Sequence, residues 1–168
     1  MKDIIQIIIF IYLIGHPEYG RTLEVVVSPT VNAAEKTINK PIVTNTIPVS
    51  ENMVVLVNIE RSKEGLRLLK INNKLNASAL AKCKDMVTNN YWAHISPNGT
   101  EPWKFILDAG YRFYYAGENL IRFYPNDQEA MKGFMGSPTH RRNVLNPNYK
   151  DIGIGRCVNM IVQHFGSL

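Results

Sequence analysis

The chain has 168 residues, of which 45% are hydrophobic and 20% are charged, so it can bury a core and is not wholly disordered. Its net charge is +5, but the basic residues are scattered without a run of five or six, and we expect no nucleic-acid partner. The two cysteines, Cys83 and Cys157, lack the C-x-x-C spacing, which excludes zinc ribbons and thioredoxin-like motifs.

An apolar stretch of eleven residues, 4–14, lies near the start of the chain. As a helix it would span about 16 Å, roughly half of a bilayer's hydrocarbon core. We therefore expect residues 1–15 to be a signal peptide or a short membrane-proximal segment, with a buried strand as the alternative. No small-x-small cleavage motif lies near residue 15, so cleavage stays open.

Residues 16–49 contain four prolines, with Ser, Thr and Asn between them. This composition is typical of an extended tether, although residues 23–27 could pair as a strand. The predicted organisation is therefore an apolar segment at 1–15, a Pro-rich linker at 16–49 and one globular domain at 50–168.

Four helices are predicted in the globular domain, each from a polar capping residue followed by a suitable helical stretch. The second is the clearest, because Ala79, Cys83 and Met86 fall on one helical face. The helices are expected at 53–59 behind Ser50, from Asn76 to about Tyr91, at 101–109 behind Thr100, and from Asn126 to about Gly136.

The predicted strands come late in the chain. They lie at 119–124, 152–157 and 160–165, and Val158-Asn159 has the position of a two-residue hairpin turn. Helices followed by mostly antiparallel strands favour an α+β layered domain over a doubly wound one.

Four residues could carry chemistry, namely His94, Glu101, Glu118 and His140, all predicted in loops or at the ends of elements. Two imidazoles and two carboxylates can bind a divalent ion such as Zn²⁺, or work as acid and base. Spacing alone does not decide whether they share a site. Each also has a structural explanation, such as a helix-dipole contact for Glu101 or a tight turn for Glu118.

Several stretches, in order along the chain, resemble the CAP superfamily, also called SCP-like domains, in its compact bacterial branch. This family includes cysteine-rich secretory proteins, insect antigen 5 and plant pathogenesis-related proteins. The matching stretches are Asn58-Ile59-Glu60-Arg61, the helix that ends before His94, Asn98 to Trp103, Gly117-Glu118-Asn119, Ser137-Pro138-Thr139-His140-Arg141-Arg142-Asn143, and the closing strands.

The resemblance implies a three-layer α-β-α sandwich around a small antiparallel sheet. It also implies that His94, Glu101, Glu118 and His140 surround one central cavity. His94 and His140 would then be the metal ligands, with Glu101 and Glu118 orienting the imidazoles or completing the coordination. Phe134 stands where the family usually has Trp. Cys83 and Cys157 could form a disulfide after export, or remain two buried thiols.

The function expected from these features is that of a secreted or surface-tethered CAP-domain protein, a binding module more than an enzyme. Its cavity would hold a divalent metal ion, preferably Zn²⁺, or a small ligand, lipid or cell-wall component. The N-terminal apolar segment would keep it near a membrane. Two alternatives stay open, a metal-assisted extracellular hydrolase and a structural module whose four polar residues only hold loops together. No residue is assigned a catalytic role.

Overall fold

A computed structural model describes residues 49–168. The apolar segment predicted at 1–15 and the linker predicted at 16–49 lie outside the described residues, except for Val49, where the first helix begins. In the described part, no helix is both long and apolar enough to cross a membrane.

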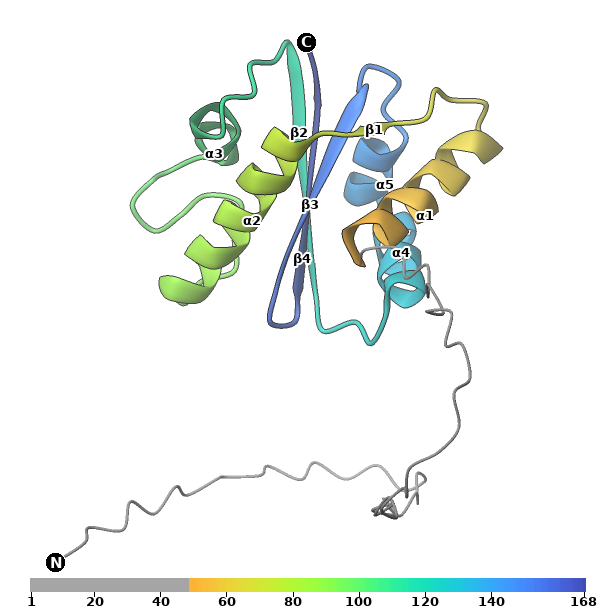
Figure 1. Ribbon diagram of the computed structural model, residues 1–168. Helices are drawn as coiled ribbons and strands as arrows, with labels where there is room; N and C mark the ends of the chain where they lie inside the picture. The colour runs from red at the N-terminus through yellow and green to blue at the C-terminus, as the bar shows by residue number, and fades with distance from the viewer. Residues whose placement is uncertain (1–48) are drawn as a thin grey trace, which may run out of the picture. The chain divides into compact units, whose positions relative to one another are not determined.

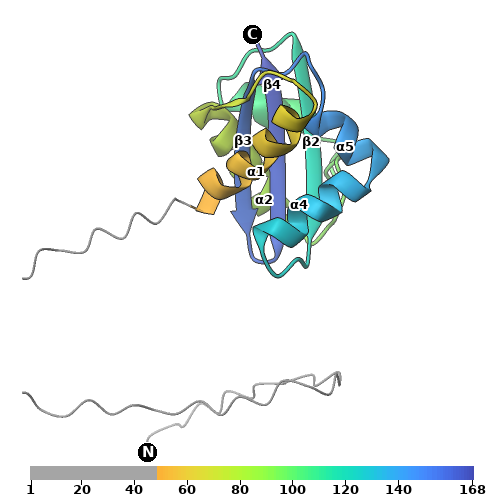
Figure 2. The same ribbon diagram turned by 90° about the vertical axis from the view of Figure 1, so that its right-hand side faces the viewer.

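The domain is a mixed sheet covered by helices on both faces. The sheet has the strand order β1-β3-β4-β2 and is antiparallel, apart from the two-residue β1, which runs parallel to β3. Helices α2 and α3 lie on one face, and α1, α4 and α5 lie on the other (Figures 1 and 2). This arrangement confirms the α+β class. In chain order the elements are α1 (Val49–Lys63), β1 (Lys70–Ile71), α2 (Asn73–Thr88), α3 (Pro102–Asp108), β2 (Tyr115–Arg122), α4 (Asp127–Gly136), α5 (Pro138–Val144), β3 (Asp151–Cys157) and β4 (Met160–Ser167).

Two predicted helix starts were wrong by a few residues. Helix α1 already includes Ser50, its predicted cap. Helix α2 begins after Asn72, whose side chain accepts a hydrogen bond from the Lys74 backbone N–H, whereas Asn76 lies inside the helix. The Asn76 side chain instead accepts from the Ile154 backbone N–H on β3. The residue types that cap helices therefore indicated roughly where each helix starts but not the exact capping residue, because Asn side chains also form tertiary hydrogen bonds.

Two further elements differ from the prediction near the candidate residues. Strand β2 begins at Tyr115, so Glu118 lies within a strand and not in the turn before it. His140 lies in α5, a helix that was predicted as a loop. The Ser137-Pro138 pair marks its start, because proline is favoured in the first helical turn.

The Asn58 and Arg61 side chains of α1 are structural. Asn58 exchanges two hydrogen bonds with the Leu69 backbone, of 3.0 and 2.8 Å. The buried Arg61 guanidinium donates to the carbonyls of Val144 and Asn146, at 2.8 and 2.9 Å. These bonds satisfy carbonyls at the end of α5 and so fix this helix against α1.

The backbone of helix α2 packs directly against the backbone of β3. A Cβ atom added at Gly153 would lie well inside van der Waals contact of the Leu75 and Asn76 backbone, and one at Gly155 would strike Ala79. Only glycine therefore allows this approach. A disulfide between Cys83 of α2 and Cys157 of β3 closes the other end of the same contact, with the Cα atoms 6.0 Å apart. This pairing resolves the alternative left open by the sequence.

We predict that Gly153→Ala lowers the free energy of unfolding by about 3 kcal/mol, because the new methyl group must push α2 away from the sheet. Gly136→Ala, at the exposed end of α4, is the matched control, since its Cβ would meet no atom within 4 Å. Urea unfolding measures both, and the control should be neutral or stabilise by up to about 1 kcal/mol. Equal effects of the two substitutions would contradict this account of the α2–β3 contact.

Candidate functional site

A cavity of about 370 Å³ opens beside the first half of β2. It brings together His94, Glu101 and Glu118, three of the four residues selected from the sequence. His140 does not line this cavity. It lies on α5, where Asn143, one helical turn further on, reaches the cavity wall. The lining residues are His94, Ile95, Glu101, Pro102, Trp103, Ala116, Gly117, Glu118 and Asn143.

Glu118 is the centre of a chain of buried hydrogen bonds. One carboxylate oxygen accepts from His94 Nδ1 at 2.6 Å, and the other accepts from His164 Nε2 at 2.9 Å. The second ring nitrogen of His164 is joined to Ser78 Oγ at 2.7 Å. Glu118, His164 and Ser78 are almost fully buried, whereas the His94 side chain is 55% exposed. The chain therefore runs from the core of the domain to the cavity.

The loop that carries His94 is tied to α2 by two charged side chains. The buried Lys82 ammonium donates to the His94 carbonyl at 2.7 Å and to the Tyr91 hydroxyl at 2.9 Å. The Asp85 carboxylate accepts from Ser96 Oγ at 2.7 Å and also from the Tyr91 hydroxyl. These bonds hold the loop on both sides of His94, so the position of its imidazole is set before any ligand arrives.

The surroundings of Glu118 keep its carboxyl ionised. Burial raises its pKa, but the hydrogen bonds from His164 and His94, with the charges of His164 and Lys82, outweigh burial and hold the pKa below its ordinary value. Burial also lowers the pKa of Lys82, while the charges of Glu118 and Asp85 act in the opposite direction. The charge of Lys82 and those of Glu118 and Asp85 thus favour one another's ionised forms in this part of the core.

An ionised carboxylate can only accept hydrogen bonds, which fixes the proton on His94. The imidazole must donate from Nδ1 to Glu118, so in its neutral form Nε2 carries a lone pair. That nitrogen is the acceptor that His94 offers to the cavity.

His140 occupies a different environment. Its ring packs edge-on against Phe134, with the ring centroids 5.5 Å apart, and its buried Nδ1 has no hydrogen-bond partner among the described residues. Burial and the nearby His94 lower the pKa of His140, which favours its neutral form. Its carbonyl accepts from Asn119 at 3.1 Å, so this part of α5 is fixed to β2.

The four residues selected from the sequence do not form a preassembled metal site. Within residues 49–168, no three His, Cys, Asp or Glu side chains are grouped so that they could hold one ion. Both oxygens of Glu118 are already bonded to imidazoles, so Glu118 orients His94 and has no oxygen free of these bonds. Metal binding by His94 and His140 stays a prediction.

Comparison with known proteins identifies the domain. The sequence model of the cysteine-rich secretory protein (CAP) family matches residues 54–161. The chain belongs to the CAP family. The uncharacterized protein YkwD of Bacillus subtilis is 39% identical over 123 residues, which are 73% of this chain and 48% of that protein. The chain thus spans about half the length of this relative.

Solved structures agree with the CAP fold. An extracellular SCP-domain protein of Bacillus anthracis superposes with a TM-score of 0.68 and 29% identity, over 71% of this chain and 40% of that one. An outer surface protein of Borrelia burgdorferi superposes with a TM-score of 0.65 and 21% identity, over 70% of this chain and 90% of that one. The second likeness bears on the fold alone.

Three residues of the candidate site were missed in the sequence, namely Ser78, Lys82 and His164. His164 lies in the predicted strand 160–165 beside Gln163, and this polar pair in an otherwise apolar strand was the available signal. Its role depends on strand register, because His164 pairs with Glu118 on β2 and with Gly153 on β3. Register between strands far apart in the chain cannot be read from one sequence.

We predict that Glu118→Gln flattens the acid side of the stability profile. The pKa of Glu118 is lower in the folded state than its ordinary value of 4.5. Its contribution to stability is therefore present above about pH 4.5 and is lost as the pH falls through the folded-state pKa. Urea unfolding over this range should show a smaller loss of stability in Glu118→Gln than in the wild type.

The matched control for this measurement is Glu129→Gln, which removes a half-exposed carboxylate beside Lys132 on α4. It should retain the wild-type loss of stability in acid. Parallel profiles for the wild type and Glu118→Gln would contradict the proposed ionisation of Glu118.

Proposed function

We propose that this CAP domain works outside the cell or at its surface, as a binding module. The similar B. anthracis protein is described as extracellular. The Cys83–Cys157 disulfide is the kind of bond that persists in an oxidising compartment. The apolar segment predicted at residues 1–15 would supply export or a membrane-proximal position.

We further propose that the cavity takes a ligand rich in hydrogen-bond donors, of the size of a cell-wall sugar. The observation that carries this proposal is the 2.6 Å bond between Glu118 and His94, which leaves His94 Nε2 as an acceptor. The Glu101 carboxylate lines the same cavity and makes no capping hydrogen bond to α3. Ile95 and Trp103 add apolar surface on which a sugar ring could stack.

A divalent metal ion is the second candidate ligand, because it is also bound by atoms that carry a free lone pair. His94 Nε2 and His140 Nδ1 are the nitrogen atoms without a protein partner that favour it. A metal ion held by these two would take its remaining ligands from Glu101, water or the bound molecule.

The hydrolase alternative gains no support from the hydroxyl groups near the site. Ser78 is on the buried face of α2, and Ser96 Oγ is bonded to Asp85. The structural alternative, in which the polar residues only hold loops together, predicts a loss of stability without a loss of any ligand. Stability and binding must therefore be measured on the same variants.

Calorimetric titration of the full chain with N-acetylglucosamine, and separately with Zn²⁺, tests the proposal. We predict that Glu101→Gln and His94→Ala each weaken binding of the sugar about tenfold or more, because each removes an acceptor for a hydroxyl or amide donor. If the metal is the ligand, His94→Ala and His140→Ala should both abolish Zn²⁺ binding.

Glu129→Gln again serves as the control, and it should leave both titrations unchanged. Thermal unfolding of every variant separates a lost ligand contact from a lost fold. Sugar binding that persists unchanged in His94→Ala and Glu101→Gln would contradict the assignment of the cavity. A failure of both the sugar and Zn²⁺ to bind would also contradict it.

A further inference from the structure

Apolar and aromatic side chains are exposed at one end of the domain, where the hairpin between β3 and β4 meets the end of β2. Val158 is 81% exposed and Phe123 is 69% exposed. Their segments lie side by side, because the Phe123 N–H donates to the Asn159 carbonyl at 2.9 Å. We call this surface the end patch and define it as Val87, Trp92, Arg122, Phe123, Tyr124 and Val158.

Arg122 is the basic centre of the end patch. Its guanidinium carbon lies 4.8 Å from the Trp92 ring centroid and 5.1 Å from that of Phe123. Within the described part of the chain, Arg122 forms no ion pair with an acid. Stacking on the two rings holds the guanidinium in place and leaves its N–H groups free for an anionic group.

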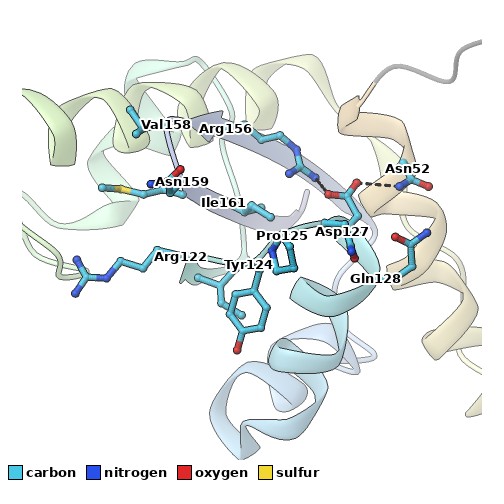
Figure 3. Close-up of a pocket in the computed structure, with 13 residues that line it drawn as sticks. Asn52, Arg122, Tyr124, Pro125, Asp127, Gln128, Arg156, Val158, Asn159 and Ile161 are labelled. Atoms are coloured by element: carbon cyan, nitrogen blue, oxygen red, sulfur yellow. Dashed lines mark hydrogen bonds and ion pairs between the residues drawn. The ribbon is translucent and has the colours of Figure 1, made fainter. Parts of the chain in front are cut away.

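Asp127, an acid that lines the same cavity as Arg122, does not neutralise it. Asp127 accepts from Arg156 at 2.6 Å and from Asn52 at 2.9 Å, so its carboxylate is already engaged. Figure 3 shows Arg122 and Tyr124 pointing away from this group of three side chains. The end patch is therefore positively charged as well as apolar.

The backbone conformation of the end patch is costly. Phe123 and Val158 have positive φ angles of 65° and 50°, a region that disfavours residues with a side chain and β-branched ones most of all. Glycine or asparagine would fit both positions better. Burial of the side chains does not compensate for this cost, because both are exposed, so the cost indicates a role outside the fold of the domain.

An anionic bilayer surface fits these features better than a protein partner. The patch lies where the ends of α2 and β2 meet the β3–β4 hairpin turn. Its aromatic, apolar and arginine side chains have the composition of segments that settle at the membrane interface. Its charge is complementary to anionic headgroups. A second cavity, beside the end patch, is lined by Arg122, Tyr124 and Val158 and also by Asn52 of α1. The described chain begins three residues before Asn52, so the segment that leads back to the apolar stretch 4–14 joins the domain at this end.

We propose that the end patch docks the domain onto an anionic lipid bilayer. Arg122 binds a headgroup phosphate, and Phe123 and Val158 enter the interface. The candidate cavity includes Ala116 to Glu118, near the opposite end of β2, so it stays open to the outside when the patch is docked.

The test uses the full chain carrying Trp103→Phe, which leaves Trp92 as the single tryptophan. Vesicles of equimolar phosphatidylglycerol and phosphatidylcholine with brominated acyl chains should quench Trp92 emission, and vesicles of phosphatidylcholine alone should quench it much less. The docking constant, taken from the quenched fraction, should fall about tenfold in Phe123→Ser and about fivefold in Arg122→Gln.

Tyr114→Ser is the matched control, because Tyr114 is an 87% exposed aromatic residue just before the start of β2. It should leave quenching unchanged, and circular dichroism should show the same fold in all variants. Residues 1–48 are present in all variants and could attach the chain to vesicles without the end patch. Sedimentation of the protein with vesicles, without quenching of Trp92, would therefore overturn the proposal. Quenching in Phe123→Ser equal to that of the parent chain would also overturn it. So would a concentration-dependent dimer that buries Trp92 from solvent in the absence of vesicles.

Discussion

The close approach of α2 to β3 is the constraint on which the candidate site depends. Gly153 and Gly155 leave no side chain between the helix and the strand, and the Cys83–Cys157 disulfide closes the same interface. In the sheet, Gly153 lies beside His164, so the helix can bring Ser78 within 2.7 Å of the His164 ring. From there the hydrogen bonds pass through Glu118 to His94. The glycines of β3 therefore determine, through this chain of hydrogen bonds, how the His94 imidazole is oriented at the cavity.

Strand β2 connects two regions with different chemistry. Near its start, Glu118 is buried, ionised and bonded on both oxygens, and the adjoining cavity offers acceptors to a ligand. At its far end, Arg122 and Phe123 are exposed and offer a cation and an apolar ring. One end of the strand thus suits recognition of a small polar molecule, and the other suits attachment of the domain to a membrane surface. This division fits a module that is held at a surface and samples ligands outside it.

The sequence predicted the class of the fold and three of the cavity residues because these depend on local signals. Helical spacing placed α2 and α4, whereas His94, Glu101 and Glu118 were selected by residue type, and the resemblance of the surrounding motifs to the CAP family implied their shared cavity. It missed α5, which was predicted as a loop, and it placed His140 in the cavity lining, which His140 does not join. Ser78 and His164 meet only through strand register and helix packing, so no local pattern reveals them.

The protonation of the His94 ring is the most direct test of the central claim, that buried Glu118 orients His94 for binding. Long-range proton–nitrogen correlation spectra of the histidine rings distinguish the two neutral tautomers. The account predicts a proton on His94 Nδ1 and a bare Nε2 in the wild type, with a mixture of tautomers in Glu118→Gln. A proton on Nε2 with a bare Nδ1 in the wild type would contradict it.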